Sequence, residues 1–94
     1  MISITITRQA KTELVQSIRI EGHAGEGAPA KWCHGVSAIT NVLAELLDVP
    51  RPTDGLTDLK VPVEYSGSAY VHFAITGYKQ AARLAPRHVK VTFK

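Results

Sequence analysis

The sequence has only one cysteine, Cys33, and aromatic residues make up only 6% of its 94 residues. A single cysteine excludes an internal disulfide, so in a reducing compartment this thiol is either buried and inert or exposed and reactive. No stretch approaches the roughly 20 apolar residues of a membrane-spanning helix. The first residues alternate between apolar and polar and lack the continuous apolar run of a secretory signal, so we expect a cytoplasmic protein.

Runs of like charge are also missing, although the net charge is +3 at pH 7. The basic residues are scattered along the chain, with a mild enrichment between Lys79 and Lys94. That segment lacks the stacking aromatic pattern that RNA-binding sheets use. We therefore do not expect a nucleic-acid partner, and a basic RNA-binding module is the weakest of the functional hypotheses.

The residues that are present suffice for one hydrophobic core. Hydrophobic residues make up 45% and charged residues 20% of the chain, which is ordinary for a globular protein. The length predicts a single domain, residues 1–94. Because a domain of this size buries a modest share of its surface, an oligomer interface would add to its stability.

Two alternating segments near the N-terminus predict a β-hairpin. Ile2, Ile4 and Ile6 alternate with serine and threonine, which is the pattern of a half-buried strand. Alternation resumes over residues 17–22. The following segment, 22–31, is rich in glycine and alanine and predicts a mobile loop.

A helical spacing of apolar residues begins near Cys33 and continues to Asp48, where a proline-containing segment ends it. The residues expected to form the apolar stripe of this helix are Val36, Ile39, Leu43, Leu46 and Leu47. This helix is expected to supply much of the core.

The second half of the chain predicts another hairpin, a short helix and a final strand. Residues 59–65 and 69–75 alternate on either side of a Ser-Gly-Ser turn, and Pro62 places the first of them at an edge or bulge. Residues 77–85 form a short helix candidate, and 88–94 a closing strand. The order of strand, strand, helix, strand, strand, short helix, strand indicates an α+β domain with a mainly antiparallel sheet, built from two hairpins plus a C-terminal strand.

Cys33 lies at the start of the predicted main helix, where unpaired N–H groups and the positive end of the helix dipole favour a thiolate. His23, at the end of the preceding strand, is a candidate to take the thiol proton and return it to a leaving amine. The same N–H groups are candidates to stabilise the oxyanion of a tetrahedral intermediate. Ser37, one turn further along the helix, could orient the thiol, the histidine or a water.

A structural interpretation remains open for these residues. A lone cysteine on a helix is more often a small buried hydrophobe, and a histidine beside glycine is more often a loop residue. His23, Cys33 and His34 lack the CxxC or HxxxH spacing of a zinc site, so we expect no metal. His72 and His88 have no partner that the sequence can name, and we take them as structural or surface residues.

Two short motifs resemble those of the ribosomal-processing cysteine proteases, the Prp or YsxB-like family. They are GHA at 22–24 and CHGVSA at 33–38, which look like that family's Gly-His-Ala motif and its Cys-x-x-Val-Ser-Ala motif at a helix start. The predicted order of elements is similar over nearly the whole chain. This resemblance implies that His23 is the general base, Cys33 the nucleophile and Ser37 a supporting residue.

The same resemblance implies a substrate and an assembly. Family members cleave a short N-terminal extension from a large-subunit ribosomal protein, are typically homodimers and use no metal or organic cofactor; related phage proteins are thought to process capsid or scaffold proteins. Their glycine-rich loop moves to admit the substrate peptide, which makes Gly22, Gly25 and Gly27 candidate substrate-binding residues. Trp32, beside the nucleophile, either lines a pocket for an apolar substrate side chain or caps the core.

Three features differ from the family pattern. Ala30 stands where the family usually has an aspartate, three residues before the cysteine. The loop between His23 and Cys33 is shorter, and the second helix is predicted to be brief. The leading hypothesis is therefore a divergent, phage or bacterial, cysteine endopeptidase, and the alternative is a non-catalytic Prp-like binding or adaptor protein.

Overall fold

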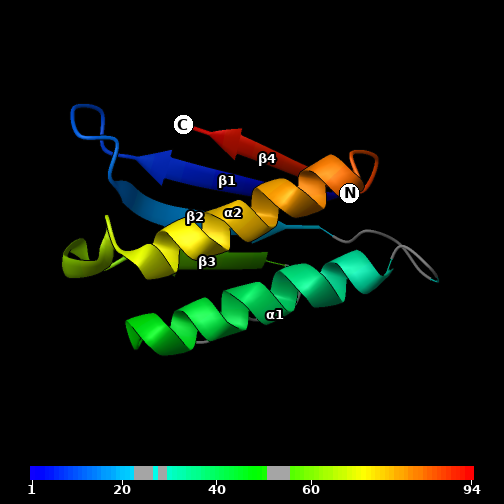
Figure 1. Ribbon diagram of the computed structural model, residues 1–94, viewed down its shortest axis with the longest axis horizontal. Coiled ribbons are helices and arrows are strands. Elements are labelled where there is room, and N and C mark those ends of the chain that lie inside the picture. The colour runs from blue at the N-terminus through cyan, green and yellow to red at the C-terminus, as the bar shows by residue number, and fades with distance from the viewer. Residues whose placement is uncertain (23–26, 28–29, 51–55) are drawn as a thin grey trace.

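The computed structural model describes residues 1–22, 27, 30–50 and 56–94. It has two layers, a four-stranded sheet and two helices that lie on the same face of it (Figure 1). The elements, in chain order, are β1 (Ile2–Arg8), β2 (Val15–Glu21), α1 (Ala30–Leu47), β3 (Leu56–Lys60), the 3₁₀ turn η1 (Val63–Tyr65), α2 (Ala69–Leu84) and β4 (Val89–Phe93). The predicted α+β class is confirmed.

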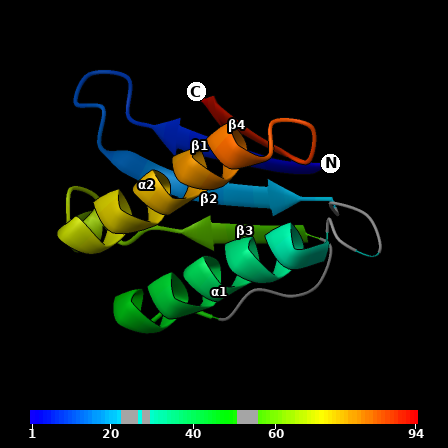
Figure 2. The same ribbon diagram turned by 45° about the vertical axis from the view of Figure 1, so that its right-hand side comes forward.

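The strands follow the order β3-β2-β1-β4 across the sheet (Figure 2). The β1/β2 and β2/β3 pairs are antiparallel, as expected for a mainly antiparallel sheet, whereas β1 and β4 are parallel. Parallel neighbours need a crossover connection. Here α2 provides it, because it carries the chain from edge strand β3 back over the sheet to the opposite edge strand β4.

The N-terminal hairpin is confirmed. Ile2, Ile4 and Ile6 are almost completely buried and face the helices, while the polar residues between them lie half exposed on the open face. The register pairs Ile4 with Ile20 and Ile6 with Ile18, so β2 adds a second apolar row beside the first. The period-two pattern therefore determined both the strand and its buried side.

Helix α1 begins at Ala30, three residues earlier than expected, and its buried face is rotated slightly from the predicted stripe. Its buried residues are Val36, Thr40, Leu43, Ala44 and Leu47. Leu46 was expected to face the core but is 44% exposed. A helix that packs on one sheet and one neighbouring helix buries a single stripe, and Leu46 falls just outside it.

The prediction of a second hairpin is wrong, because the segment 69–75 is the first half of α2. Val71, Ala74 and Tyr78 are buried at three- and four-residue spacing, which is helical. Ser68, assigned by the sequence to a turn, instead caps the helix: its side chain accepts a hydrogen bond from the Val71 N–H at 3.4 Å. The apolar residues at 69, 71, 73 and 75 alternate as they would in a strand, which led to the wrong prediction. Helix α2 has 16 residues, whereas a brief helix was expected.

A buried hydrogen bond joins the two helices. Thr40 Oγ1 lies 2.7 Å from Tyr78 Oη and also 2.7 Å from the Val36 carbonyl oxygen. The carbonyl can only accept, so the single threonine proton goes to Val36 and Tyr78 must donate to Thr40. Burial raises the pKa of Tyr78 to about 12, although the hydrogen bond to Thr40 acts in the opposite direction. The phenol is therefore neutral and fixes the contact between α1 and α2.

Candidate functional site

Cys33 lies in the first turn of α1, as the sequence predicted. It is half buried and packs against the hydrophobic core. Side chains of a helix lean toward its N-terminus, so the thiol extends over the turn that begins the helix. This position suits a nucleophile, because the side chain packs against the core and lies at the positive end of the helix dipole, which favours a thiolate.

The amide groups of this first turn are the candidate oxyanion donors. The Ala30 N–H is already used, since it donates to the Gly27 carbonyl oxygen at 3.0 Å. The next two amides, of Lys31 and Trp32, have no acceptor within the helix. No described residue accepts a hydrogen bond from them. Among the described residues, the Lys31 and Trp32 amides are therefore the candidate oxyanion donors.

The polar residues near Cys33 on α1 are exposed. His34 is the next residue and lies on the solvent side of the helix, away from the core that Cys33 contacts. Ser37 is exposed one turn later, and its carbonyl oxygen accepts a hydrogen bond from Asn41 Nδ2 at 2.9 Å. Ser37 is therefore a solvent-exposed residue that follows Cys33 by one helical turn.

Trp32 also packs against the core and is half buried. The ammonium group of Lys31 lies 5.3 Å from the centre of its ring. The contact with the core supports the interpretation of Trp32 as a cap of the core. Its exposed part remains available to a substrate side chain, and that role stays a prediction.

Two glycines of the predicted substrate loop are described, and both have left-handed backbone conformations. Gly22 has φ +85°, and a side chain there would collide with the carbonyl oxygen of Met1. Gly27 has φ +75° in open space. The glycine of the GHA motif thus has a structural reason to be glycine, because β2 ends against the start of β1. His23 and Gly25 lie outside the described residues, so their predicted roles stay predictions.

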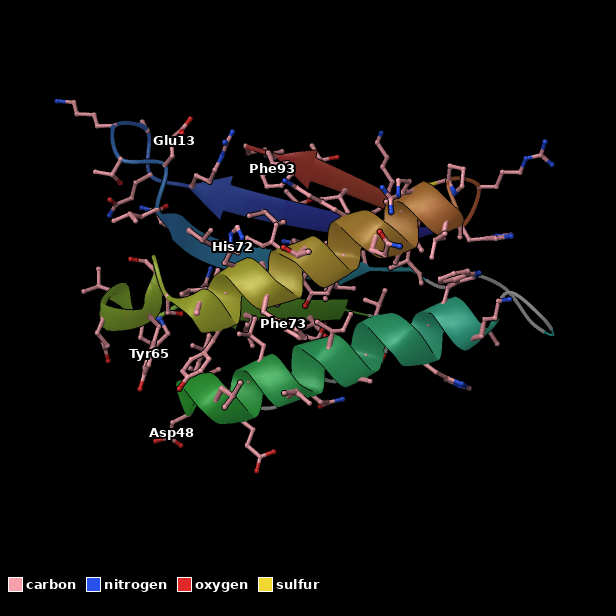
Figure 3. The ribbon with its side chains drawn as sticks, in the orientation of Figure 1. Glu13, Asp48, Tyr65, His72, Phe73 and Phe93 are labelled. Atoms are coloured by element: carbon pink, nitrogen blue, oxygen red, sulfur yellow. The ribbon has the colours of Figure 1, made fainter. Side chains whose placement is uncertain are left out.

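The remaining histidines are structural or surface residues, as expected, although neither lies in a strand as the sequence predicted. His72 is exposed on α2 (Figure 3). His88 is half buried before β4, and its carbonyl oxygen accepts a hydrogen bond from the Ile2 N–H at 2.7 Å. In the part of the chain that the structure describes, no three His, Cys, Asp or Glu side chains are grouped closely enough to hold a metal ion. Neither described helix is long and apolar enough to cross a membrane.

An apolar groove between the two helices was missed by the sequence. It has a volume of about 220 Å³ and is lined by Ala38, Ile39, Val42, Leu43, Leu46, Tyr70, Phe73 and Ala74. Phe73, which is 72% exposed, extends from α2 on the side of α1 (Figure 3). The sequence did not reveal the groove because Tyr70 and Phe73 had been assigned to a strand. The groove adjoins the half of α1 that follows Cys33.

Solved structures share this fold. The ribosomal processing protease Prp from S. aureus, in complex with a covalently linked product peptide, has a TM-score of 0.83 at 17% sequence identity, and the match covers 100% of both chains. The same protease with a substrate peptide has a TM-score of 0.78 at 20% identity, again over 100% of both chains. SMU.848 from Streptococcus mutans has a TM-score of 0.80 at 17% identity, covering 99% of this chain and 96% of that one.

Sequence comparison alone gives no such relationship. No protein-family model matches the chain, and no curated protein matches it. The structural likeness confirms the resemblance to Prp at the level of the fold. The structure also corrects one difference from that family that was expected from the sequence. The second helix is not brief, because α2 has 16 residues and continues to Leu84.

Proposed function

We propose that the protein is a cysteine endopeptidase of the ribosomal-processing kind, which cuts one peptide bond in a specific protein segment. The observation that carries this proposal is the place of Cys33, in the first turn of a helix and against the core. The fold around it is that of a protease whose structure holds a covalently linked product peptide. The motif that precedes α1 supplies His23 as the base.

The proposed reaction has two acyl-transfer steps. Cys33 Sγ attacks the carbonyl carbon of the scissile bond while His23 takes the thiol proton, and the backbone N–H groups of Lys31 and Trp32 stabilise the resulting oxyanion. The tetrahedral intermediate collapses to a thioester, and His23 gives its proton to the leaving amine. Water, deprotonated by His23, then attacks the thioester, and the thiolate leaves and recovers a proton. The products are two peptides, one with a new carboxylate and one with a new amine.

The proposed substrate is the N-terminal extension of a ribosomal protein in the cytoplasm or, for a chain of phage origin, a capsid or scaffold protein. The proposed assembly is a homodimer. Ser37 is exposed one turn from Cys33 and is proposed to hold a water or the substrate backbone there. Ala30 supplies no carboxylate to orient the histidine, so the proposed catalytic unit is a Cys33 and His23 pair without a third member.

Co-expression with a candidate substrate tests the proposal. The native protein should shorten a ribosomal protein that carries an N-terminal extension, whereas the Cys33→Ser and His23→Ala variants should leave its intact mass unchanged. His72→Ala is a matched control, because it removes an exposed histidine on α2 and should not affect cleavage. Cleavage that survives Cys33→Ser would refute the mechanism.

Thiol labelling tests the activated cysteine without a substrate. Iodoacetamide should label Cys33 at pH 7 faster than it labels a cysteine in an unstructured peptide, and His23→Ala should slow that reaction. His34→Ala should not, because this exposed side chain lies on the solvent side of α1. Equal rates for the native protein, the His23 variant and the peptide would contradict the proposed pair.

A non-catalytic binding or adaptor protein is the second candidate, and Ala30 is the observation that favours it. The short second helix expected from sequence no longer supports it, since α2 is complete. An adaptor predicts that native protein and Cys33→Ser bind the same segment equally and that neither cuts it. Intact mass and a pull-down from the same co-expression separate the two candidates.

A further inference from the structure

The charges of the chain are segregated between its two parts. Residues 69–94, which form α2 and β4, contain five lysines and arginines and no aspartate or glutamate. Residues 1–68 contain six lysines and arginines and eight aspartates and glutamates. The net charge of +3 is therefore the sum of a strongly basic segment, residues 69–94, and a mildly acidic one, residues 1–68.

The fold gathers these cations along one edge of the sheet and adds one from β1. The ring of Phe93 lies 5.2 Å from the guanidinium carbon of Arg8 and 5.1 Å from the ammonium nitrogen of Lys79. Lys94 follows directly, since its N–H donates to the Ile6 carbonyl and its own carbonyl accepts from the Arg8 N–H, both at 2.9 Å. Figure 3 shows Phe93 at β4, the edge strand beside β1. We call this part of the surface the basic edge; it consists of Arg8, of Lys79 and Arg83 on α2, of Arg87 in the turn before β4, and of Lys90 and Lys94 at β4. The register pairs Phe93 with Ile6 and Lys90 with Ser3, so the cations of this edge lie on both sides of β4.

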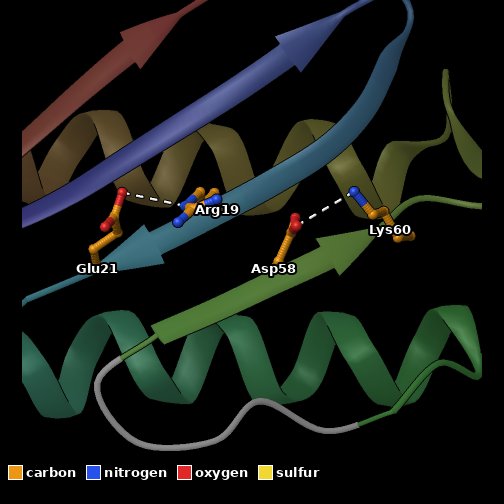
Figure 4. Close-up of polar contacts among 4 residues, drawn as sticks. All are labelled: Arg19, Glu21, Asp58 and Lys60. Atoms are coloured by element: carbon orange, nitrogen blue, oxygen red, sulfur yellow. Dashed lines mark hydrogen bonds and ion pairs between the residues drawn. The ribbon is translucent and has the colours of Figure 1, made fainter.

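The cations of β2 and β3 are paired with carboxylates of the same strand. On the open face of the sheet, Arg19 lies 3.2 Å from Glu21, and Lys60 lies 3.3 Å from Asp58 (Figure 4). Each pair lies on a single strand, so the part of the open face formed by β2 and β3 is close to neutral. These cations have little left to offer an external anion.

Charges of the basic edge are mostly unpaired. Arg8 has an ion pair with Glu13 at 3.7 Å, but no described carboxylate pairs with any of the other five cations. Lys79 and Arg83 are both exposed and lie one turn apart on α2, where like charges destabilise a helix. The only polar partner of the Arg83 guanidinium among described residues is the side-chain oxygen of Gln80, at 2.6 Å. The cations of the edge therefore repel one another, and a bound anion would relieve this repulsion.

The shape of the basic edge suits a polymer of phosphates. A strand rises about 3.3 Å per residue and a helix about 1.5 Å, so Lys90 and Lys94 lie roughly 13 Å apart and Lys79 and Arg83 roughly 6 Å apart along their elements. One small anion cannot span that band. The single aromatic ring there, Phe93, is already in contact with Arg8 and Lys79, so the edge offers no free stacking platform for bases.

We propose that the basic edge binds the phosphodiester backbone of a nucleic acid, without reading its sequence. This revises the expectation from sequence, in which the same lysines and arginines were too scattered to form a site. The proposal does not depend on the peptidase, because Cys33 takes no part in it. It is therefore measured with the Cys33→Ala protein, and its outcome is independent of any cleavage assay.

Fluorescence anisotropy with a labelled single-stranded RNA, and a DNA of the same sequence, tests the proposal. The decisive comparison uses two triple variants with the same loss of charge. One removes unpaired cations of the edge, Lys79→Gln, Arg83→Gln and Lys90→Gln. The other removes cations outside it, Lys11→Gln, Arg19→Gln and Lys60→Gln. All six side chains are exposed, and circular dichroism confirms that both variants fold.

The edge variant should bind at least about tenfold more weakly at low salt, and its plot of log affinity against log salt should be flatter by about 2, since each lost phosphate contact removes about 0.7. The control variant should change affinity less than about threefold. Equal binding of RNA and DNA supports backbone recognition, and a preference for RNA supports it with an added contact to the 2′-hydroxyl. Equal loss in the two variants, or competition by poly-glutamate as strong as by RNA, would overturn the proposal.

Discussion

The two halves of α1 meet opposite demands. The first turn holds Cys33 half buried, near two backbone N–H groups that donate to no described residue. The second half is fully buried at Leu43 and Leu47 and is joined to α2 through Thr40. The first half places a thiol partly at the surface, whereas the second half is fixed in the core and against α2. The proposed chemistry would therefore lie at the less tightly packed end of a helix whose other end is fixed by the core.

The largest effect is expected at the reactive half. Cys33→Ala should abolish cleavage, with a loss on the order of 10⁴-fold or more, because no other thiol is present. The free energy of unfolding should change by only about 1 kcal/mol or less, since the side chain is small and half buried. Paired measurements of cleavage rate and urea unfolding check both values. A large loss of stability would contradict the division of α1 into two halves.

The next effect is expected at the packing half. Leu43→Ala should lower the free energy of unfolding by about 2–5 kcal/mol, because the side chain is 2% exposed and its removal leaves a cavity. The matched control is Leu46→Ala, a leucine on the same helix that is 44% exposed and should cost about 1 kcal/mol or less. Similar losses in the two variants would show that α1 lies differently on the sheet.

The hydrogen bond between the helices gives a smaller, directional effect. Because Tyr78 donates and Thr40 accepts, Thr40→Val leaves a buried phenol without an acceptor and should cost about 1–3 kcal/mol. Tyr78→Phe leaves Thr40 still bonded to the Val36 carbonyl and should cost about 0.5–1.5 kcal/mol. Urea unfolding of both variants tests the assignment, and a greater cost for Tyr78→Phe would reverse it.

The same phenol predicts how stability depends on pH. Burial raises the pKa of Tyr78 to about 12 in the folded protein, above the value of about 10 for an exposed tyrosine. The folded state therefore binds the phenol proton more tightly than the unfolded state does. This proton contributes at most about 3 kcal/mol to the free energy of unfolding. The contribution is complete below pH 10 and is lost as the pH rises toward 12. In urea unfolding between pH 9 and 12, the native protein should lose stability relative to Tyr78→Phe. A difference that stays constant with pH would show that the phenol titrates alike in both states.

The smallest effect is expected at Gly77, where α2 packs against Ile39 of α1. A Cβ at Gly77 would lie 2.8 Å from Ile39 Cδ1, the end of a flexible side chain beside the apolar groove. Gly77→Ala should gain about 1 kcal/mol of helix propensity and lose a similar amount by displacing that methyl group, for a net change within about 1 kcal/mol. Combination with Ile39→Val should shift the balance toward stabilisation. A loss above 2 kcal/mol would mean that Ile39 cannot move.

Strict periodicity made part of the fold predictable. Ile2, Ile4 and Ile6, which are β-branched and alternate with serine and threonine, were correctly assigned to a strand with one buried face, and Cys33 was placed correctly at a helix start. The strand expected at 69–75 was wrong because three apolar residues at alternate positions fit both a strand and part of a helix. The helix is favoured by the contact of Tyr78 with Thr40 of α1, a residue that is distant in sequence.

Features that depend on long-range arrangement had no local signal. Parallel pairing of β4 with β1 follows from the crossover made by α2, which the sequence had divided between a strand and a short helix. The apolar groove exists because Phe73 lies outside the stripe that α2 buries. The basic edge required Arg8 and Lys79 to meet over Phe93, and no spacing in the sequence brings those three together.

Strand β1 has one neighbour that is close in sequence and one that is distant. Its pairing with β2 closes a short turn, whereas pairing Ile2 with Val89 brings together opposite ends of the sequence. Closing the longer loop costs more entropy, so the hairpin is expected to form first and to act as a template on which the last strand is added. In hydrogen exchange, the amides that join β1 to β4 should then open at lower free energy than those that join β1 to β2, even though they lie in the same strand.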